Sequence, residues 1–142
     1  MGEKRSAFRE IEHTADLGME VEGADSAELF SAAAKGLYRL IADPTLIESK
    51  EEIAVSASAE GWEELLHAWL CELLAQFNLK GFVGKKCDIK RLDAGRVEAR
   101  VKGETLDLKR HLFFTEIKGV TYHGLRVWQE NGIWHARVIF DV

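Results

Sequence analysis

Cysteine, proline and long apolar runs are scarce in this sequence of 142 residues, which has two Cys and one Pro. Cys71 and Cys87 fit no metal-binding or redox spacing, so we assign them neither role. No apolar run approaches the length of a membrane span, and residues 1–6 lead into no signal-peptide core. These absences predict a cytoplasmic protein that has no membrane partner.

Familiar catalytic signatures are missing as well. The sequence contains no GxGxxG, P-loop, C-x-x-C or HExxH pattern, and no serine stands in a nucleophile elbow. The sequence therefore gives no support for a nucleotide-binding enzyme, a zinc protease or a serine hydrolase.

Charge is unevenly distributed along the chain. Residues 1–79 contain 6 Lys or Arg against 16 Asp or Glu, whereas residues 80–142 contain 13 against 8. The net charge of −5 makes independent nucleic-acid binding unfavourable, because neutralisation of phosphates dominates that affinity. A local basic face stays open as an alternative, but we expect the acidic and basic halves to pair with each other in space rather than to form an RNA-binding face.

The hydrophobic periodicity predicts an α+β fold, in which two helices pack on a mainly antiparallel sheet. Strands are expected at residues 8–13, 17–23, 53–59, 82–92 and 96–102, and helices from Asp25 to the Asp43-Pro44 stop and from Trp62 to about Phe77. A final hairpin adds two strands, so the order is ββαβα followed by four strands. The length favours one domain that spans residues 1–142.

Three further features of the central region carry predictions. Gly36 costs about 1 kcal/mol relative to Ala in the middle of a helix, so we expect it to mark close packing. His67 and Cys71 lie one turn apart on the second helix, and we interpret them as helix-flank residues, not zinc ligands. Residues 103–117 have no clean period and contain a polar run, which we interpret as a long surface loop that is a candidate for function.

The last hairpin has the clearest signal, because Asn131-Gly132 is typical of a two-residue type I′ turn. Pairing Glu130 with Ile133 sets Gln129 opposite Trp134, Val127 opposite Ala136, Leu125 opposite Val138 and His123 opposite Phe140 on the core face, and Trp128 opposite His135, Arg126 opposite Arg137, Gly124 opposite Ile139 and Tyr122 opposite Asp141 on the other. Two directly opposed arginines are unfavourable alone. We therefore expect an acid from the N-terminal half, or an anion, to lie over Arg126 and Arg137.

Three oxygen donors at the two ends of the chain suggest a metal site. Asp16 follows the break after the first strand, while Asp141 and the terminal carboxylate of Val142 end the last one. If these groups meet, they repel unless a proton or a cation lies between them, and Ca²⁺ or Mg²⁺ prefers such ligands. Alternatively, Asp16 is an Asx-turn residue and His13 is a satisfied polar residue at a strand end.

Several motifs together resemble the archease family over nearly the whole chain. They are Glu12-His13-Thr14-Ala15-Asp16, the helix entry from Gly23 to Phe30, residues 65–74, Gly103-Glu104, residues 118–123 and the ending from Trp134 to Val142. The order and spacing of these motifs are specific, although each is weak alone. The chain has Cys71 where the family often has Asn, at a position that we interpret as structural.

The resemblance implies a protein that is not an enzyme by itself. It would be a protein cofactor of the RNA-splicing ligase RtcB in tRNA splicing, which promotes guanylation of the ligase and its multiple turnover. It also implies a divalent cation, most often Ca²⁺, although Mg²⁺ or Mn²⁺ would also suit the ligands, which would be Asp16, Asp141 and the carboxylate of Val142. Around this pocket the family motifs place His13, Lys118, Thr121, Tyr122 and His123. Contact with tRNA or with a tRNA-modifying enzyme would be indirect.

Three other functions stay open. The first is a chaperone or specificity modulator of another tRNA-processing enzyme, such as a tRNA cytosine methyltransferase. The second is a small metal-dependent hydrolase in which His13 or His123 acts as the base. The third is a structural module whose acidic residues only cap turns.

Overall fold

The computed structural model describes residues 8–13 and 16–142, and for residues 11–13 it describes the backbone alone. The elements are β1 (Phe8–His13), β2 (Asp16–Gly23), α1 (Ser26–Ile41), η1 (Pro44–Leu46), β3 (Glu51–Ser58), α2 (Trp62–Lys80), β4 (Phe82–Asp93), β5 (Arg96–Thr105), β6 (Gly119–Val120), β7 (Arg126–Glu130) and β8 (Ile133–Asp141). The α+β class and the expected element order are confirmed, and the strand expected before Asn131 is divided into β6 and β7.

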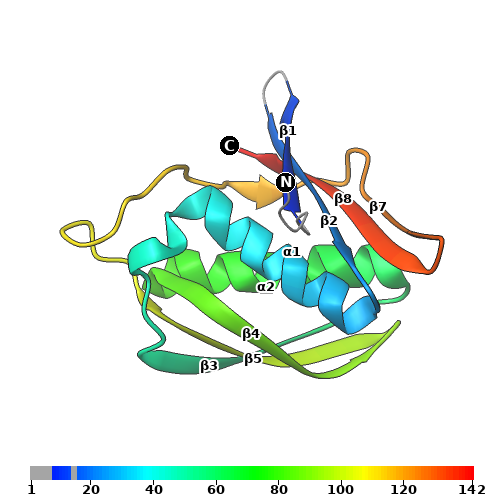
Figure 1. The fold of residues 1–142 in the computed structure, drawn as a ribbon, viewed down its shortest axis with the longest axis horizontal. Coiled ribbons are helices and arrows are strands. Elements are labelled where there is room, and N and C mark those ends of the chain that lie inside the picture. Colours follow the sequence, from blue (N-terminus) through cyan, green and yellow to red (C-terminus); the bar gives the residue numbers. More distant parts are fainter. Residues whose placement is uncertain (1–7, 14–15) are drawn as a thin grey trace.

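The two helices lie between two antiparallel sheets (Figure 1). One sheet has the order β1-β2-β8-β6, with β7 also paired to β8, and the other has the order β3-β5-β4. Both α1 and α2 contact strands of both sheets, so the core occupies the helical layer and its two interfaces. No described helix is long and apolar enough to cross a membrane.

Helix α1 begins and ends where its sequence predicts. The Asp25 carboxylate accepts the Glu28 backbone N–H at 2.8 Å, which satisfies one of the first free donors of the helix, and the Glu28 side chain accepts the N–H of Ala24, the residue before the cap. The helix ends at Ile41, before Pro44. Helix α2 ends at Lys80 and is capped by Gly81, whose φ of +70° is a left-handed conformation that favours glycine.

Gly36 marks the close approach of α1 to the first sheet, as its position in the helix predicts. A Cβ atom at Gly36 would lie 2.7 Å from Met19 Sδ and 2.7 Å from a ring carbon of Phe8. Between the helices, the Trp69 indole N–H donates to the Phe30 carbonyl at 3.0 Å, and both side chains are fully buried. These contacts fix the helical layer against the sheet that carries both Asp16 and Asp141.

The register of the last hairpin is confirmed from Arg126 to Arg137. The strands pair Glu130 with Ile133 and Arg126 with Arg137, and both turn residues, Asn131 and Gly132, have positive φ. Beyond Arg126 the expected pairing is wrong. Residues 121–125 leave the sheet in a turn, and β6 pairs with β8 in their place, with Val120 opposite Phe140.

The four pairings expected beyond Arg126 are therefore corrected. Gly119, not Tyr122, lies opposite Asp141, and Val120, not His123, lies opposite Phe140. Leu125 and Gly124, expected opposite Val138 and Ile139, belong to the turn and are not among the residues paired with β8. The turn gives Gly124 a φ of +61°, and the Leu125 N–H donates to the Tyr122 carbonyl. An uninterrupted antiparallel ladder cannot absorb these extra residues, so the strand is divided.

The segment expected to be a surface loop from residue 103 begins later than predicted. Strand β5 continues to Thr105, and the irregular connection to β6 starts at Leu106. Glu104 and His111 are buried residues, with 3% and 5% exposure. The polar run is thus partly interior, because residues 44–50 and the connection itself close over the end of β5.

Candidate functional site

Asp16 and Asp141 meet across neighbouring strands, although 125 positions separate them in the sequence. Strand β2 pairs with β8 in an antiparallel register that sets Asp16 directly opposite Asp141. Directly opposed residues of antiparallel strands place their side chains on the same face of the sheet. The two carboxylates therefore belong to one face at one end of the first sheet.

The hydrogen bonds of β8 show which kind of pair these residues form. The Lys118 N–H donates to the Asp141 carbonyl at 2.7 Å, and the Thr121 N–H donates to the Ile139 carbonyl at 3.0 Å. The polar backbone groups of Asp141 thus point away from β2. Asp16 and Asp141 form a non-hydrogen-bonded pair, in which the Cα atoms are about 4.5 Å apart and the side chains are close.

Other predicted site residues flank this pair through the backbone. His13 lies opposite Asp16 in the pairing of β1 with β2, although its side chain is outside the described part of the structure. Lys118 holds Asp141 from the other strand edge and is exposed. Val142 follows Asp141 and is 38% exposed. Thr14 and Ala15, which connect the two strands in the motif, lie outside the described residues.

Thr121, Tyr122 and His123 make their contacts elsewhere. The Thr121 hydroxyl donates to the Ile139 carbonyl at 2.9 Å and accepts the His123 N–H. The Tyr122 ring stacks on His67 of α2, with ring centroids 4.0 Å apart, and its hydroxyl donates to Glu64. These contacts anchor the turn after β6 to helix α2.

His67 is a helix-flank residue that supports the strand beside the carboxylate pair. Its Nε2 lies 2.9 Å from the Val120 carbonyl, and its Nδ1 lies 3.7 Å from Cys71 Sγ. A proton on Nε2 satisfies both contacts, because Nδ1 can then accept the weak thiol donor. Burial, the larger cause, and nearby Glu72 raise the pKa of the Cys71 thiol, which keeps it protonated. This arrangement holds β6, and with it the edge beside Asp141.

The chemistry of the carboxylate pair fits a hard cation. Two aspartates on one face present only oxygen donors, and Asp141 is exposed, so a cation and water have access to it. Like charges directly opposite each other destabilise an antiparallel pair unless something compensates them. Among the described residues, no group of three or more His, Cys, Asp or Glu side chains could hold a metal ion. Further ligands would have to be a terminal or backbone oxygen, water or a partner.

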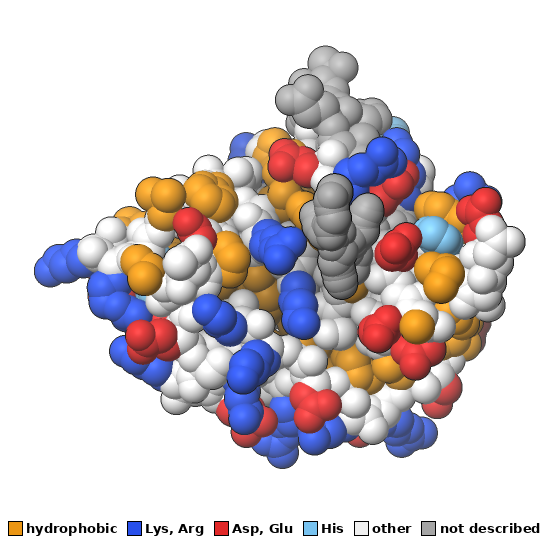
Figure 2. All heavy atoms as spheres, in the orientation of Figure 1, with side chains coloured by type: hydrophobic (Ala, Val, Ile, Leu, Met, Phe, Trp, Pro, Cys, Tyr) orange, Lys and Arg blue, Asp and Glu red, His pale blue; other side chains and the backbone are white. Residues whose placement is uncertain are grey.

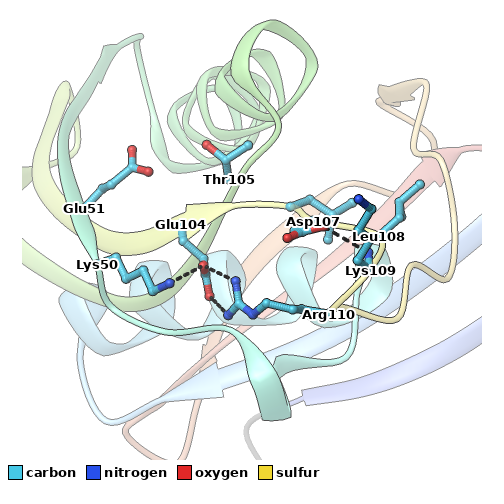
Figure 3. Close-up of a pocket in the computed structure, with 9 residues that line it drawn as sticks. Lys50, Glu51, Glu104, Thr105, Asp107, Leu108, Lys109 and Arg110 are labelled. Carbon is cyan, nitrogen blue, oxygen red and sulfur yellow. Dashed lines mark hydrogen bonds and ion pairs between the residues drawn. The ribbon is translucent and has the colours of Figure 1, made fainter.

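A second carboxylate, that of Glu104, has a different environment that sequence reasoning missed (Figure 3). Arg110 binds it with two hydrogen bonds of 3.1 and 3.0 Å, and the Glu48 backbone N–H donates to it at 2.7 Å. Lys50 Nζ approaches to 3.8 Å. The cluster lies beside a hollow of about 630 Å³, lined by Lys50, Glu51 and residues 104–110.

His111 completes this cluster in a defined tautomer. The Asp107 N–H donates to His111 Nδ1 at 2.8 Å, so the ring proton is on Nε2 and is donated to Glu104 at 3.1 Å. The hydrogen bonds from Arg110 lower the pKa of Glu104 from 4.5 to about 2, and the Glu48 N–H and His111 act in the same direction against the effect of burial. Glu104 is thus a buried anion that ties the connection after β5 to the sheet.

The acidic cover expected over the opposed arginines is found for Arg137. Glu20 lies opposite Arg137 in the pairing of β2 with β8, and its carboxylate is 3.4 Å from the guanidinium. Arg126 instead lies over the ring of Trp128, 4.5 Å from its centroid, and His135 stacks on the same ring. The N-terminal half therefore supplies the predicted acid, and an aromatic ring accommodates the second arginine.

Comparison with known proteins gives a consistent result over nearly the whole chain. Residues 8–142 match the model of the Archease protein family. A protein archease of Methanopyrus kandleri is 36% identical over 138 residues, which cover 95% of this chain and 99% of that protein. A protein archease of Thermococcus gammatolerans is 34% identical over 139 residues, with 95% and 98% coverage.

Two solved structures have the same fold. A solution structure of a Methanobacterium thermoautotrophicum protein superimposes with a TM-score of 0.82 at 32% identity and covers 96% of this chain and 99% of that one. The crystal structure of an archease from Thermotoga maritima, described as a possible chaperone, gives a TM-score of 0.66 at 25% identity, with coverage of 93% and 94%.

Proposed function

The chain belongs to the archease protein family, and from this membership we propose that it is an activator of the RNA-splicing ligase RtcB in tRNA splicing. The ligase takes a guanylyl group onto a histidine before it seals RNA. In this proposal, the protein promotes that guanylation step and allows the ligase to turn over repeatedly. It acts as a protein cofactor and performs no reaction by itself.

The observation that carries the proposal is the opposed pair of carboxylates at the end of the first sheet. Asp16 and Asp141 come from strands that are far apart in sequence, and the register places them together on one face. A fold that needed these side chains only as turn caps would gain nothing from setting two like charges side by side. The arrangement is understandable if the site receives a cation.

We propose that Asp16, Asp141 and the α-carboxylate of Val142 hold a divalent cation, with Ca²⁺ as the expected ion. Such a cation would neutralise triphosphate charge during nucleotidyl transfer. The sheet fixes the aspartates, because β8 is held by β2 on one side and by Lys118 and β6 on the other. Ca²⁺ takes six to eight oxygens, so these residues leave positions for water or a partner.

The flanking residues have lesser roles in this proposal. Lys118 is exposed beside Asp141 and could contact a phosphate or a carboxylate of the ligase. His13 lies beside Asp16 on the neighbouring strand. Thr121, Tyr122 and His123 act through position, since their contacts with β8 and α2 hold the strand edge next to the carboxylates.

The test is a guanylation assay of the ligase with GTP and without RNA, in the presence and absence of this protein. We expect the wild-type protein to increase the yield of guanylated ligase, and Asp16→Ala and Asp141→Ala to reduce the stimulation at least tenfold without loss of the fold. The matched control is Glu130→Ala, which removes an exposed acid at the end of β7. Equal stimulation by both aspartate variants would reject the cation role. Rapid nucleotide hydrolysis by the protein alone would favour the hydrolase.

Exposed apolar side chains support a second candidate function. In the connection between β5 and β6, Leu108, Leu112 and Phe114 are 73%, 60% and 52% exposed, and such side chains mark surfaces that contact other proteins. The Thermotoga relative is described as a possible chaperone. The alternative is therefore a chaperone or specificity modulator of another tRNA-processing enzyme, such as a tRNA cytosine methyltransferase.

One double variant separates the two candidates. If the chaperone function holds, Leu112→Ser with Phe114→Ser should abolish protection of the client enzyme from aggregation, measured by light scattering. The same variant should leave ligase guanylation unchanged if the carboxylate pair carries the activity. Loss of guanylation stimulation in this variant, with both aspartates intact, would favour the chaperone candidate.

A further inference from the structure

The outer face of the β3-β5-β4 sheet carries a concentration of basic side chains. Along β5, Arg96, Glu98, Arg100 and Lys102 alternate with the buried residues Val97, Ala99 and Val101, so the first set faces away from the helices. Figure 2 shows several Lys and Arg side chains, with Asp and Glu side chains among them, over the lower part of the molecule, where β4 lies below α1 in Figure 1. This face is separate from the sheet that carries Asp16 and Asp141.

The acids on this face neutralise its bases only in part, with Glu52 opposite Lys102 and Asp88 opposite Arg100 in the strand register. Asp88 pairs with Lys90 at 2.7 Å, and Glu98 pairs with Arg96 at 2.6 Å. Within the described part of the chain, no carboxylate lies within salt-bridge distance of Lys86, Arg100 or Lys102. Glu104, the next outward position of β5, is already bound by Arg110.

Two of these unpaired cations lie directly opposite each other. The pairing of β4 with β5 sets Lys86 opposite Lys102, and like charges in that position are unfavourable. Arg100 stands two residues before Lys102 on β5, so these two side chains project from the same face about 6.8 Å apart along the strand. A row of cations with this spacing suits an anion that also carries charges in a row.

The shape of the face allows such a ligand to approach. A hollow of about 580 Å³ is lined by Lys35, Glu52, Lys86, Cys87, Asp88, Lys90, Arg100 and Lys102. A second, of about 460 Å³, lies on Ala54, Val55, Ser56 and the neighbouring part of β5. Both include Lys90 and Arg100, so they form one continuous surface, and the small side chains of β3 keep its floor open.

We propose that this face binds the phosphate backbone of single-stranded RNA. The inference rests on the proposed function, since an activator of an RNA ligase would gain by contact with the same RNA, and it adds a direct RNA contact to that function. The residues that line both hollows include no aromatic ring. Base stacking is therefore absent, and binding should be electrostatic and insensitive to sequence.

The position of the face makes the inference separable from the cation site. The helical layer lies between the two sheets, so a ligase that docks at the Asp16–Asp141 end leaves the β3-β5-β4 face open (Figure 1). Substitutions on this face should therefore change RNA binding but not guanylation of the ligase, which needs no RNA. The two proposals can fail independently.

The experiment measures binding of a fluorescein-labelled 20-nucleotide oligo(U) to the full chain by anisotropy. If about three cations contact phosphates, affinity should fall roughly 20-fold between 50 and 200 mM NaCl. The double variant Arg100→Glu with Lys102→Glu should weaken binding at least tenfold at 50 mM NaCl. The control is Lys80→Glu with Lys109→Glu, which makes the same charge change at two exposed lysines outside both hollows and should weaken binding less than threefold.

Several results would overturn the inference. Absence of RNA binding by the wild-type protein at 50 mM NaCl would do so, as would equal losses in the double variant and its control. Binding to phosphatidylserine vesicles but not to RNA would identify a membrane surface as the ligand instead. Arg100→Ser with Lys102→Ser is a milder variant that preserves the test if the glutamates disturb folding. Guanylation assays on the same variants separate the two proposals. Unchanged stimulation of guanylation together with weakened RNA binding supports both proposals. If the wild-type protein binds RNA through this face but does not stimulate guanylation, the RNA-binding inference holds and the proposed function is rejected.

Discussion

The carboxylate of Glu104 and the carboxylates of Asp16 and Asp141 have opposite environments in the same fold. Glu104 is buried, and Arg110, His111 and a backbone N–H all donate to it. Asp16 and Asp141 are set against each other at a sheet end, where Asp141 is exposed. The first arrangement is a finished structural contact, whereas the second places like charges together where a ligand has access.

This difference separates stability from function in the molecule. Removing one partner of a buried, hydrogen-bonded ion pair leaves the other groups buried without a partner, so the free energy of unfolding is lowered. Removing the exposed Asp141, which lies directly opposite a like charge, relieves a repulsion, so the cost falls on whatever the pair binds. The predictions below depend on that contrast.

The largest effect is expected for Glu104→Gln. It should lower the free energy of unfolding by about 3 kcal/mol, because Arg110 and His111 lose a charged acceptor in a buried site. In a chain of this length the melting temperature should fall by roughly 10 °C, measured by circular dichroism. Glu116→Gln makes the same chemical change at an exposed position of the following connection and should be neutral. Equal melting temperatures for the two variants would contradict the structural role of Glu104.

The pH dependence of that effect gives the second prediction. The folded state lowers the pKa of Glu104 from 4.5 to about 2, so the folded protein binds this proton less readily than the unfolded chain does. The advantage of the wild-type protein over Glu104→Gln should be full above pH 4.5 and should disappear as the pH falls from 4.5 towards 2. Urea unfolding of both proteins across this window measures it. A difference that stays constant down to pH 2.5 would show that the carboxylate is not held as an anion.

An intermediate effect is expected at the chain end beside Asp141. If the α-carboxylate of Val142 is a cation ligand, one glycine added after it should weaken Ca²⁺ binding about tenfold, since the added residue moves the charge away. Val142→Ala keeps the carboxylate and is the matched control. Calorimetric titration compares the two, and equal affinities for the extended and control proteins would remove this carboxylate from the ligand set.

The smallest expected change in stability is at Asp141, and its sign is opposite to that of the change at Glu104. With a chelator present, Asp141→Asn should raise the free energy of unfolding by a few tenths of a kcal/mol, because it removes one of two directly opposed charges. Glu104→Gln has the opposite sign under the same conditions. Chemical unfolding in low salt is the measurement, and a clear loss of stability in Asp141→Asn would mean that the fold, not a ligand, uses this carboxylate.

Local signals in the sequence were sufficient for the helices and the last turn. Asp25 marks the start of α1 and Pro44 marks its end, and Asn131-Gly132 fixes the register of β7 with β8, because each of these signals acts within a few residues. The same register failed beyond Arg126. There the chain turns so that Tyr122 can stack on His67, a residue more than fifty positions away, and no local pattern encodes that contact.

The two carboxylate centres were not equally predictable. The approach of Asp16 to Asp141 was expected from the chemistry of the residues and from the resemblance to a family, and the pairing of β2 with β8 sets them opposite each other. Their role as cation ligands stays a prediction. Glu104 was missed because burial of an acid depends on donors from Glu48 and Arg110, which the sequence does not place. The sequence did contain one signal: Glu104 follows Arg100 and Lys102 at every second position, which indicates that strand β5 extends to Glu104.

The most direct test is calorimetric titration of Ca²⁺ into the wild-type protein, Asp16→Asn and Asp141→Asn, with Glu130→Asn as a control for removing an exposed acid from the same sheet. We expect one binding site in the wild-type and control proteins and no measurable binding in either aspartate variant. Binding of equal affinity in all four proteins, or none in the wild-type protein, would contradict the claim that the opposed aspartates exist to hold a cation.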